Sequence, residues 1–320
     1  MQSRHSHATV SRVARMSARE IKDLPASVHN RLLRVSKERD ERLTVILTSY
    51  ALERFLYRIS QSAYKDRFVL KGALVFSVWM DKSHRSTRDL DLLGWGESAA
   101  THLEGMFREI CECPVCDDGL QFLAGTVQGH EIREDQEYGG IRVHIQCLLG
   151  NARIPIRIDI GFGDAVTPEP QEMAFPTLLD FPAPVLNAYP KETVVAEKLQ
   201  AIVTLGMANS RMKDFYDLWV LANSFEFEGH MLSEAISATF TRRETAFPKE
   251  APMGLSDEFG SDTTKQTQWR AFTRKLAPML GQPTLQEVVA ILSGFLLPPT
   301  LSAGARLPFR KTWHPEGPWK

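Results

Sequence analysis

The chain has 320 residues, of which 43% are hydrophobic and 24% are charged, and its formal net charge is −1. This composition is typical of a soluble globular protein with one large domain or two smaller ones. No uninterrupted apolar run reaches membrane-spanning length, so we expect no transmembrane helix. Four cysteines are too few for a disulfide framework in a chain of this size, which favours a reducing cytoplasm.

Charge is distributed unevenly along the chain. Residues 1–66 hold thirteen Lys and Arg against seven Asp and Glu, an excess of six, so the remainder carries −7. A basic front end can contact a polyanion, although exposed Arg-rich helices are often simply solvated. The first nineteen residues contain no acid and superficially resemble a transit peptide. We interpret them as a frayed terminus, or as the product of a start codon placed too early.

From residue 27 onward the pattern predicts helices. Apolar residues recur every three or four positions, first at Val28, Leu32 and Val35 and then from Leu43 to Leu56. We expect these helices to support a sheet.

Residues 68–80 predict a strand, a turn and a helix in succession. Phe68-Val69-Leu70 predicts the strand, Lys71-Gly72-Ala73 the turn, and the apolar run from Leu74 to Met80 a helix of two turns. A glycine turn at this position directs free backbone N–H groups and the positive helix end towards a phosphate.

A pair of aspartates follows a basic loop. The loop includes Arg85 and Arg88 and leads into Asp89-Leu90-Asp91-Leu92-Leu93. Side chains alternate faces along a strand, so Asp89 and Asp91 project together while the leucines enter the core. Two such carboxylates can share divalent cations, and those cations can also bind the oxygens of a phosphate in a nearby site. Many solvated strand edges carry Asp-x-Asp, but the glycine turn and the arginines make this pair a candidate metal site.

Three cysteines lie close together at the end of the helix expected at residues 102–113. Cys111, Cys113 and Cys116 suggest zinc, with the distant Cys147 or a histidine as the fourth ligand. A reduced, partly buried loop is the interpretation that we favour.

The middle of the chain supplies a third acid. Residues 141–149 and 154–162 alternate strictly on either side of a Gly-Asn-Ala turn, which predicts a β-hairpin. Asp159 leaves the second strand on its polar face. It is either an exposed strand residue or a third carboxylate that binds metal or takes a proton from an attacking hydroxyl.

Six prolines between residues 166 and 190 predict a connector without regular structure, and we place a domain boundary there. The next segment, Lys191 to Leu205, predicts a helix with Lys198 on its apolar face. A lysine buried there needs an anionic partner. It either forms a structural bridge with an acid such as Asp214 or binds a nucleotide phosphate, and we favour the phosphate.

Gly206 predicts the end of that helix, and Asn209-Ser210 the start of another. On a helical projection Arg211 falls in the core stripe and Asp214 at its edge, whereas Asp217 lies towards the opposite side. Asp214 is therefore the better site candidate on geometry.

The last hundred residues predict helices interrupted by a polar loop at 248–264, with an extended tail from Pro298. The helix expected at 265–276 combines Lys and Arg with Trp269 and Phe272, a combination that can hold RNA by charge and stacking. Packing of both aromatics into their own domain is the explanation that we favour.

These motifs together resemble a known family. The glycine turn and the paired aspartates resemble the nucleotidyltransferase fold of polymerase-β-type enzymes. More narrowly, the chain resembles the AbiEii/AbiGii toxin nucleotidyltransferases in segments such as DRFVLKGALVFSVW, RSTRDLDLLGWG, IRIDIGFGDAV, KETVVAEKLQAIV and RMKDFYDLWVLA. The resemblance runs from about Leu24 to Asn223 and more loosely beyond. In one departure, Gly72-Ala73 replaces the usual Gly-Ser or Gly-Gly turn, so a phosphate-contacting hydroxyl is absent.

The resemblance implies an α/β (α+β) nucleotidyltransferase fold, with a small mixed sheet, N-terminal helices and a helical C-terminal domain. We expect an N-terminal helical segment at 1–66, a catalytic core at 67–165, a Pro-rich connector at 166–190, a helical domain at 191–297 and an extended tail at 298–320.

The resemblance also implies a reaction and a site. The enzyme would use Mg²⁺ or Mn²⁺ to move an NMP from an NTP to an RNA, with a tRNA 3′ end as the expected acceptor. The metal ligands would be Asp89, Asp91 and Asp159, and the catalytic set would further include Lys198, Asp214 and Asp217. The nucleotide-binding set would be Lys71, Gly72, Ala73, Arg85, Thr87, Arg88, Lys198 and Arg211.

A toxin of this kind has a separately encoded antitoxin, serves in phage defence and works in the cytoplasm. Two rivals remain open: a nucleotidyltransferase that modifies an antibiotic or a protein, and a non-catalytic nucleotide-binding regulator.

Overall fold

The computed structural model describes residues 23–80, 85, 87–132, 139–274, 276 and 283–320. The described helices are α1 (Leu24–Arg39), α2 (Leu43–Gln61), α3 (Phe76–Trp79), α4 (Ala100–Cys111), α5 (Lys191–Leu205), α6 (Met212–Ser224), α7 (Gly229–Arg242), α8 (Asp257–Ser261), α9 (Thr263–Thr273) and α10 (Leu285–Ala305). The strands are β1 (Phe68–Lys71), β2 (Asp89–Gly94), β3 (Leu120–Phe122), β4 (Gln128–Ile132), β5 (Gly140–Leu149), β6 (Ala152–Phe162), β7 (Gln171–Ala174), β8 (Val185–Ala188), β9 (Phe227–Glu228) and β10 (Thr312–Trp313).

The main sheet has eight strands in the order β3-β5-β6-β2-β1-β8-β7, with β4 also paired to β5. The pairs β2–β6 and β1–β8 are parallel and the others are antiparallel, so the sheet is mixed. The expected hairpin is confirmed as β5 and β6, which pair from Ile141 with Ile160 to Leu149 with Ala152. The predicted α/β class is therefore confirmed.

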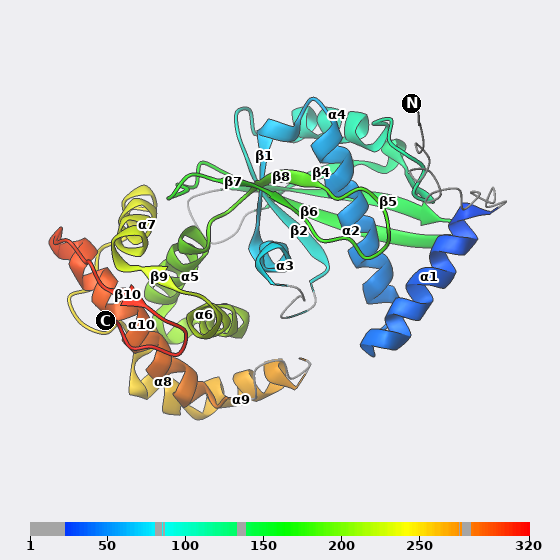
Figure 1. Ribbon diagram of the computed structural model, residues 1–320. Helices are drawn as coiled ribbons and strands as arrows, with labels where there is room; N and C mark the ends of the chain where they lie inside the picture. Colours follow the sequence, from blue (N-terminus) through cyan, green and yellow to red (C-terminus); the bar gives the residue numbers. More distant parts are fainter. Residues whose placement is uncertain (1–22, 81–84, 86, 133–138, 275, 277–282) are drawn as a thin grey trace, which may run out of the picture.

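The predicted N-terminal helices cover one face of this sheet. Asp23 caps α1 by accepting a hydrogen bond from the backbone N–H of Ala26 at 3.0 Å. Val28 and Leu32 are fully buried, as their spacing predicts. Helix α2 packs on β6 and β8, α4 packs on β4, and α1 packs on α2 and β5. Figure 1 shows the sheet with these helices in one half of the molecule and α5 to α10 gathered in the other.

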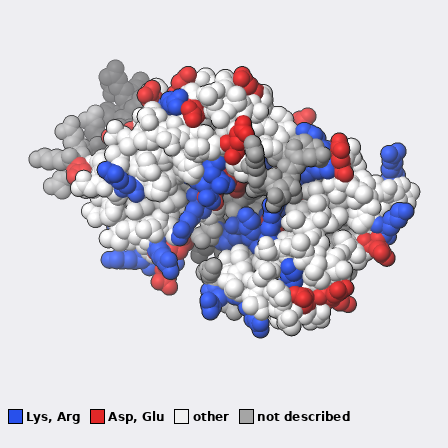
Figure 2. Space-filling view, turned by 180° about the vertical axis from the view of Figure 1, so that it is seen from behind, with Lys and Arg blue, Asp and Glu red and all other residues white. Residues whose placement is uncertain are grey.

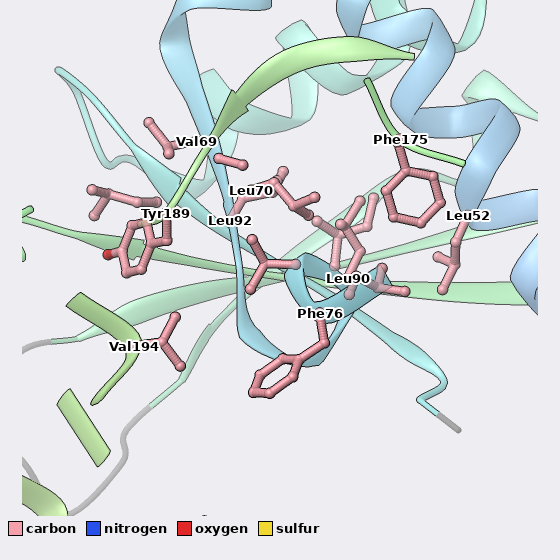
Figure 3. Close-up of a cluster of buried hydrophobic side chains, with 14 of the residues drawn as sticks. Leu52, Val69, Leu70, Phe76, Leu90, Leu92, Phe175, Tyr189 and Val194 are labelled. Atoms are coloured by element: carbon pink, nitrogen blue, oxygen red, sulfur yellow. The ribbon is translucent and has the colours of Figure 1, made fainter. Parts of the chain in front are cut away.

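The core continues from the sheet into the second half. Leu70, Leu90 and Leu92 are completely buried beside Phe76 of α3 (Figure 3). Tyr189 and Val194, from the start of the helical half, belong to the same cluster. Because one apolar cluster joins both halves, the helical part is held firmly beside the strands that carry the aspartates.

The expectation that residues 166–190 lack regular structure is wrong. Strands β7 and β8 form there and add to the sheet, with Leu70 of β1 paired to Ala188 of β8. The prolines lie outside the two short strands, where a missing N–H removes no ladder hydrogen bond. The domain division placed at this segment stays a prediction.

The expectation of an extended tail from Pro298 is also wrong for its first residues. Helix α10 contains Pro298 and Pro299 and continues to Ala305. A proline at position 299 leaves the carbonyl of Phe295 without its helical partner. The indole of Trp319 donates to that carbonyl at 2.9 Å, so the chain end compensates the helix for the lost bond.

Among the described helices, α10 has the length and apolar composition to cross a membrane, with a mean hydropathy of 1.7. Leu292, Phe295 and Leu296 of this helix are completely buried, and α10 packs on α6, α7 and α8. These contacts are typical of a core helix, and a core helix can have the same length and apolar composition as a membrane-spanning one.

Two segments that could contact a polyanion, the N-terminal basic region and the basic–aromatic helix α9, have side chains buried in the core. Arg54 and Arg58 of α2 are buried and donate to the carboxylate of the fully buried Asp118 at 3.1 and 2.7 Å. Trp269 of α9 is 3% exposed and donates to the carbonyl of Pro283 at 2.8 Å. The packing interpretation of Trp269 is therefore confirmed, and part of the N-terminal basic excess is structural. Residues 1–22 lie outside the described residues.

Cys111 is the buried last residue of α4, and the loop after it contains the half-buried Cys113 and the exposed Cys116, all three with free thiols. Among the described residues no three His, Cys, Asp or Glu side chains lie close enough to share a metal ion. The zinc hypothesis therefore gains no support from the arrangement.

Candidate active site

Three carboxylates lie on one face of the sheet, as the alternation predicts. Asp89 and Asp91 project from β2, and the leucines between and after them are buried. In the parallel pair β2–β6, Asp91 lies directly beside Asp159. Neighbouring strands are separated by about 4.8 Å, so Asp159 enters the site from a strand more than sixty residues further along the chain.

The Asp91 carboxylate is the least satisfied of the three. Burial raises its pKa to about 6, against the opposing charge of Lys71 and with a further rise from Asp159. Among the described residues, no side-chain or backbone donor bonds to this carboxylate. A half-buried carboxylate beside two others is a position that favours a bound cation.

Arginines on the same face hold the other two acids. Arg142 of β5 donates to both oxygens of Asp159 at 2.8 Å, and Arg157 of β6 bonds Asp89. With these partners the three aspartates do not converge into one three-ligand cluster, in keeping with the absence of such a cluster among the described residues. Neither arginine was identified from the sequence, because their pairing depends on the strand register.

The turn at Gly72 packs tightly against the acids. Gly72 has a φ of +70°, and a Cβ at this position would lie 2.6 Å from Cγ of Asp91. Only glycine combines that backbone conformation with so close an approach. The predicted two-turn helix after it is instead a 3-10 segment, Gly72–Val75, followed by the four-residue α3. An α-helix this short provides no helix-end phosphate site.

Lys71 forms ion pairs with acidic side chains of the protein, so in this structure its ammonium group is not available to bind a phosphate. Its Nζ is 2.7 Å from Asp164 and 3.7 Å from Glu197 of α5. Arg243 joins the same acids at 2.9 and 3.5 Å, and the Tyr189 hydroxyl donates to Glu197 at 3.1 Å. Burial lowers the pKa of Lys71, but Glu197 and Asp164 outweigh it and raise the pKa. This cluster links β1 to the helical half and supports the Gly72 turn.

A second charged group comes from the helical half. Lys198 of α5 lies 2.6 Å from Asp214 and 2.9 Å from Asp217, both on α6. Arg85 donates to both oxygens of Asp217 at 2.7 and 2.9 Å. The expected helix bounds of α5 are confirmed. The expectation that Asp217 faces away is wrong, because α6 is buried on nearly all sides.

Arg85 ties this second group to the sheet acids. Burial lowers the pKa of its guanidinium, but the charges of Asp217, Asp214 and Asp91 outweigh burial and raise it. Lys213 of α6 also reaches the site: it is exposed, and its charge lowers the pKa of Asp91. Lys213 was missed in the sequence, where only its place next to Asp214 could have pointed to it.

The remaining predicted residues lie around this centre. The Thr87 hydroxyl bonds the backbone of Asp89 at 3.3 and 3.4 Å, so it shapes the start of β2. Arg88 is exposed, and Ala73 is buried behind the turn. Arg211 is half-buried at the start of α6, where its backbone N–H donates to Asn209 at 2.8 Å.

An aspartate pair on a mixed sheet, a glycine turn against it and a Lys–Asp group from neighbouring helices are features of a nucleotidyltransferase. The comparison with protein families gives the same answer. The model of the family described as "Nucleotidyl transferase AbiEii toxin, Type IV TA system" matches residues 54–291. The chain therefore belongs to this family of nucleotidyltransferase toxins, as its motifs indicated.

Among solved structures, JHP933 from Helicobacter pylori is 14% identical, with a TM-score of 0.43 over 79% of this chain and 89% of that one. A second solved structure, of an H. pylori protein described as a candidate nucleotidyltransferase, is 15% identical, with a TM-score of 0.42 over 88% of this chain and 96% of that one. No match was found among curated proteins.

Proposed function

We propose that this enzyme uses a divalent cation, Mg²⁺ or Mn²⁺, to transfer an NMP from an NTP to an RNA acceptor, with a tRNA 3′ end as the expected acceptor. The observation that carries the proposal is the position of Asp91. It lies on the same face as Asp89 and beside Asp159. The positive charges of Lys71 and Lys213 lower the pKa of its carboxyl group, which burial raises.

The residues present fit a divalent cation. Mg²⁺ prefers hard oxygen ligands, and carboxylates usually supply one or two of them. Asp91 offers a half-buried carboxylate without a hydrogen-bond donor among the described residues, and Asp89 and Asp159 would complete the set once their arginines move aside. The bound cation would supply charge neutralisation at the transferred phosphate.

The chemistry is a substitution at the α-phosphate. The acceptor hydroxyl oxygen forms a bond to the α-phosphorus, the bond from that phosphorus to the bridging oxygen breaks, and pyrophosphate leaves with the electron pair. The hydroxyl proton passes to a carboxylate of the site or to water. Catalysis of this kind depends mainly on positioning and electrostatics.

Cationic side chains around the acids would bind the triphosphate. On the helical side these are Lys198 and Arg85, each of which already bonds a carboxylate. Arg88 and Lys213 are exposed at the site and carry positive charge towards an entering nucleotide. Phosphate binding by Lys198 requires exchange of its present partners, Asp214 and Asp217, for a phosphate.

The biological role follows from the family. A toxin of a type IV system acts alongside a separately encoded antitoxin, and we propose that this enzyme works in the cytoplasm and serves in phage defence. A growth defect on overexpression, relieved by the neighbouring antitoxin gene, supports this role. Overexpression without any growth defect contradicts it.

The test of the activity uses each of the four NTPs, labelled at the α-phosphate, with Mg²⁺, total RNA and the purified protein. We expect label in RNA with one or more of the NTPs, none after addition of EDTA, and release by RNase but not by protease. Label that resists RNase and is lost with protease identifies a protein acceptor and contradicts the RNA proposal.

A further inference from the structure

A strip of the open sheet face leads away from the aspartates, and the activity proposed above does not use it. Strand register places the side chains of β2, β6, β5 and β4 in two rows on this face. The first row is Asp91, Asp159, Arg142 and His130; the second row is Asp89, Arg157, His144 and Gln128. Each row therefore runs from an acid of the site, past an arginine, to a polar ring or amide.

This face is open to solvent beyond the acids. His130, His144 and Gln128 are exposed, whereas the alternate residues of β5, such as Val143 and Ile145, are buried on the opposite face. The helices that pack on β4, β5 and β6 are α4, α1 and α2, on the buried face. Side-chain exposure is 32% for Arg142 and 40% for Arg157, so a ligand on this face can reach both.

The chemistry of the strip suits a single nucleic-acid strand. Its cationic members are Arg142 and Arg157, with the exposed Arg153 further along β6. The rings of His130 and His144 lie 6.0 Å apart, on adjacent strands. Exposed rings on a sheet face stack with unpaired bases, while arginines bind the phosphates between them.

His144 has the properties of a stacking group. Burial lowers its pKa, and so do the neighbouring His130, Arg142 and Arg157, while Asp159 acts in the other direction. The ring is therefore predominantly neutral at pH 7, and its contribution is stacking and hydrogen bonding rather than charge.

The size and direction of the strip also fit. Three strand spacings of about 4.8 Å separate β2 from β4, roughly 14 Å in all. That length accommodates about four stacked nucleotides at roughly 3.4 Å each. Figure 2 shows Lys and Arg side chains gathered around the middle of one face of the molecule, and such a concentration of positive charge attracts a polyanion.

We propose that the sheet face formed by His130, Arg142, His144, Arg153 and Arg157 binds the unpaired 3′ end of the acceptor RNA and leads its terminal hydroxyl to Asp89 and Asp91. The proposal rests on the function proposed above and assigns the acceptor its own surface, separate from the triphosphate side at α5 and α6. Arg142 and Arg157 have two roles in it: they neutralise Asp159 and Asp89 in the free enzyme and contact RNA phosphates in the complex.

The test measures RNA binding without catalysis. The probe is a fluorescein-labelled single-stranded RNA of twelve nucleotides with a free 3′ hydroxyl, titrated with full-length protein in Mg²⁺ and without NTP. We expect His130→Ala/His144→Ala to raise the Kd for this probe at least about fivefold, the smaller effect expected for one lost stacking contact. His102→Ala, an exposed histidine on α4 at the covered face, is the matched control and keeps the wild-type Kd.

A second variant tests the charge. Arg153→Ala should make the slope of log Kd against log salt shallower by about 0.7, the value for one lost phosphate contact on a single strand. Arg39→Ala removes an equal charge from the exposed end of α1 and should leave the slope unchanged. In transfer assays the double-histidine variant should raise the KM for RNA and keep kcat at saturating RNA.

The outcomes separate this proposal from the activity itself. Wild-type RNA affinity in both test variants overturns the RNA surface, even where wild-type protein transfers label to RNA. Loss of affinity for a fluorescent NTP analogue instead of the RNA probe also overturns it, because the strip would then belong to the triphosphate. Weaker RNA binding in the variants supports the surface, even where label transfer to RNA fails and the proposed function is refuted.

Discussion

Asp91 and Asp159 are direct neighbours across the parallel pair β2–β6, yet only Asp159 is held by an arginine. The pair therefore contains one neutralised and one unsatisfied carboxylate. The unsatisfied one lies against the Gly72 turn, where burial raises its pKa. This asymmetry singles out Asp91 as the first position for an incoming cation.

Asp91→Asn and Asp89→Asn should each lower nucleotidyl transfer at least about 100-fold, because a lost metal carboxylate removes several kcal/mol of transition-state stabilisation. The measurement is initial rate with labelled NTP and RNA, together with the circular dichroism spectrum to verify the fold. Asp180→Asn, at a fully exposed side chain, is the control and should keep the wild-type rate. Wild-type rates in either site variant would refute the metal-site assignment.

The raised pKa of Asp91 predicts a specific dependence of stability on pH. Its folded-state pKa of about 6 lies above the unfolded value of 3.8, so the folded state binds more protons and loses stability as pH rises through this window. In EDTA, Asp91→Asn should therefore be more stable than wild type by about 1–2 kcal/mol at pH 8, after allowance for partial solvent screening.

The same difference should shrink as the pH falls from 6 to 4, where the wild-type carboxyl is protonated in the folded state. Urea unfolding of both proteins across that range measures it. A difference that is constant with pH would show that Asp91 is not desolvated in the metal-free enzyme.

Gly72→Ala should reduce both stability and activity. The φ of +70° costs an alanine about 1–2 kcal/mol, and the new Cβ displaces the Asp91 carboxylate. Gly105→Ala is the matched control, since a Cβ there meets no atom within 4 Å and alanine favours the α4 helix. Equal activity of the two variants would contradict the close approach of the turn to the acids.

Lys198→Met should separate the two roles discussed for this lysine. Its removal leaves Asp214 buried without a cation, which should cost about 3 kcal/mol of folding stability. Lys198→Met/Asp214→Asn should regain most of this stability but remain inactive, because neither change restores a phosphate-binding cation. Recovery of transfer together with stability would show that the lysine is only a structural bridge.

The sequence predicts the acids well because strands repeat every two residues. Alternation alone puts Asp89 and Asp91 on one face and Asp159 on the polar face of its strand, and all three positions are confirmed. The bounds of α5 follow from its apolar spacing and its final glycine in the same way. Such local patterns depend only on neighbours in the chain.

Contacts between segments far apart in the sequence cannot be predicted from these local patterns. Arg142 meets Asp159 through the hairpin register, and Lys71 meets Asp164 across 93 positions of sequence. Asp217 was misplaced because a helical projection assumes one buried face, whereas α6 is buried on nearly all sides. Prolines at 298 and 299 suggested an extended tail because the partner that stabilises α10, Trp319, lies at the far end of the chain.

The most direct test of the proposed nucleotidyl transfer to RNA is the mass of a defined RNA after reaction with unlabelled NTP, Mg²⁺ and the enzyme. We expect the RNA to gain the mass of one or more NMP units at its 3′ end, with one pyrophosphate released per unit and no gain with Asp91→Asn. An RNA of unchanged mass with the wild-type enzyme and all four NTPs would contradict the transfer to RNA, and an equal gain with Asp91→Asn would contradict the role of Asp91.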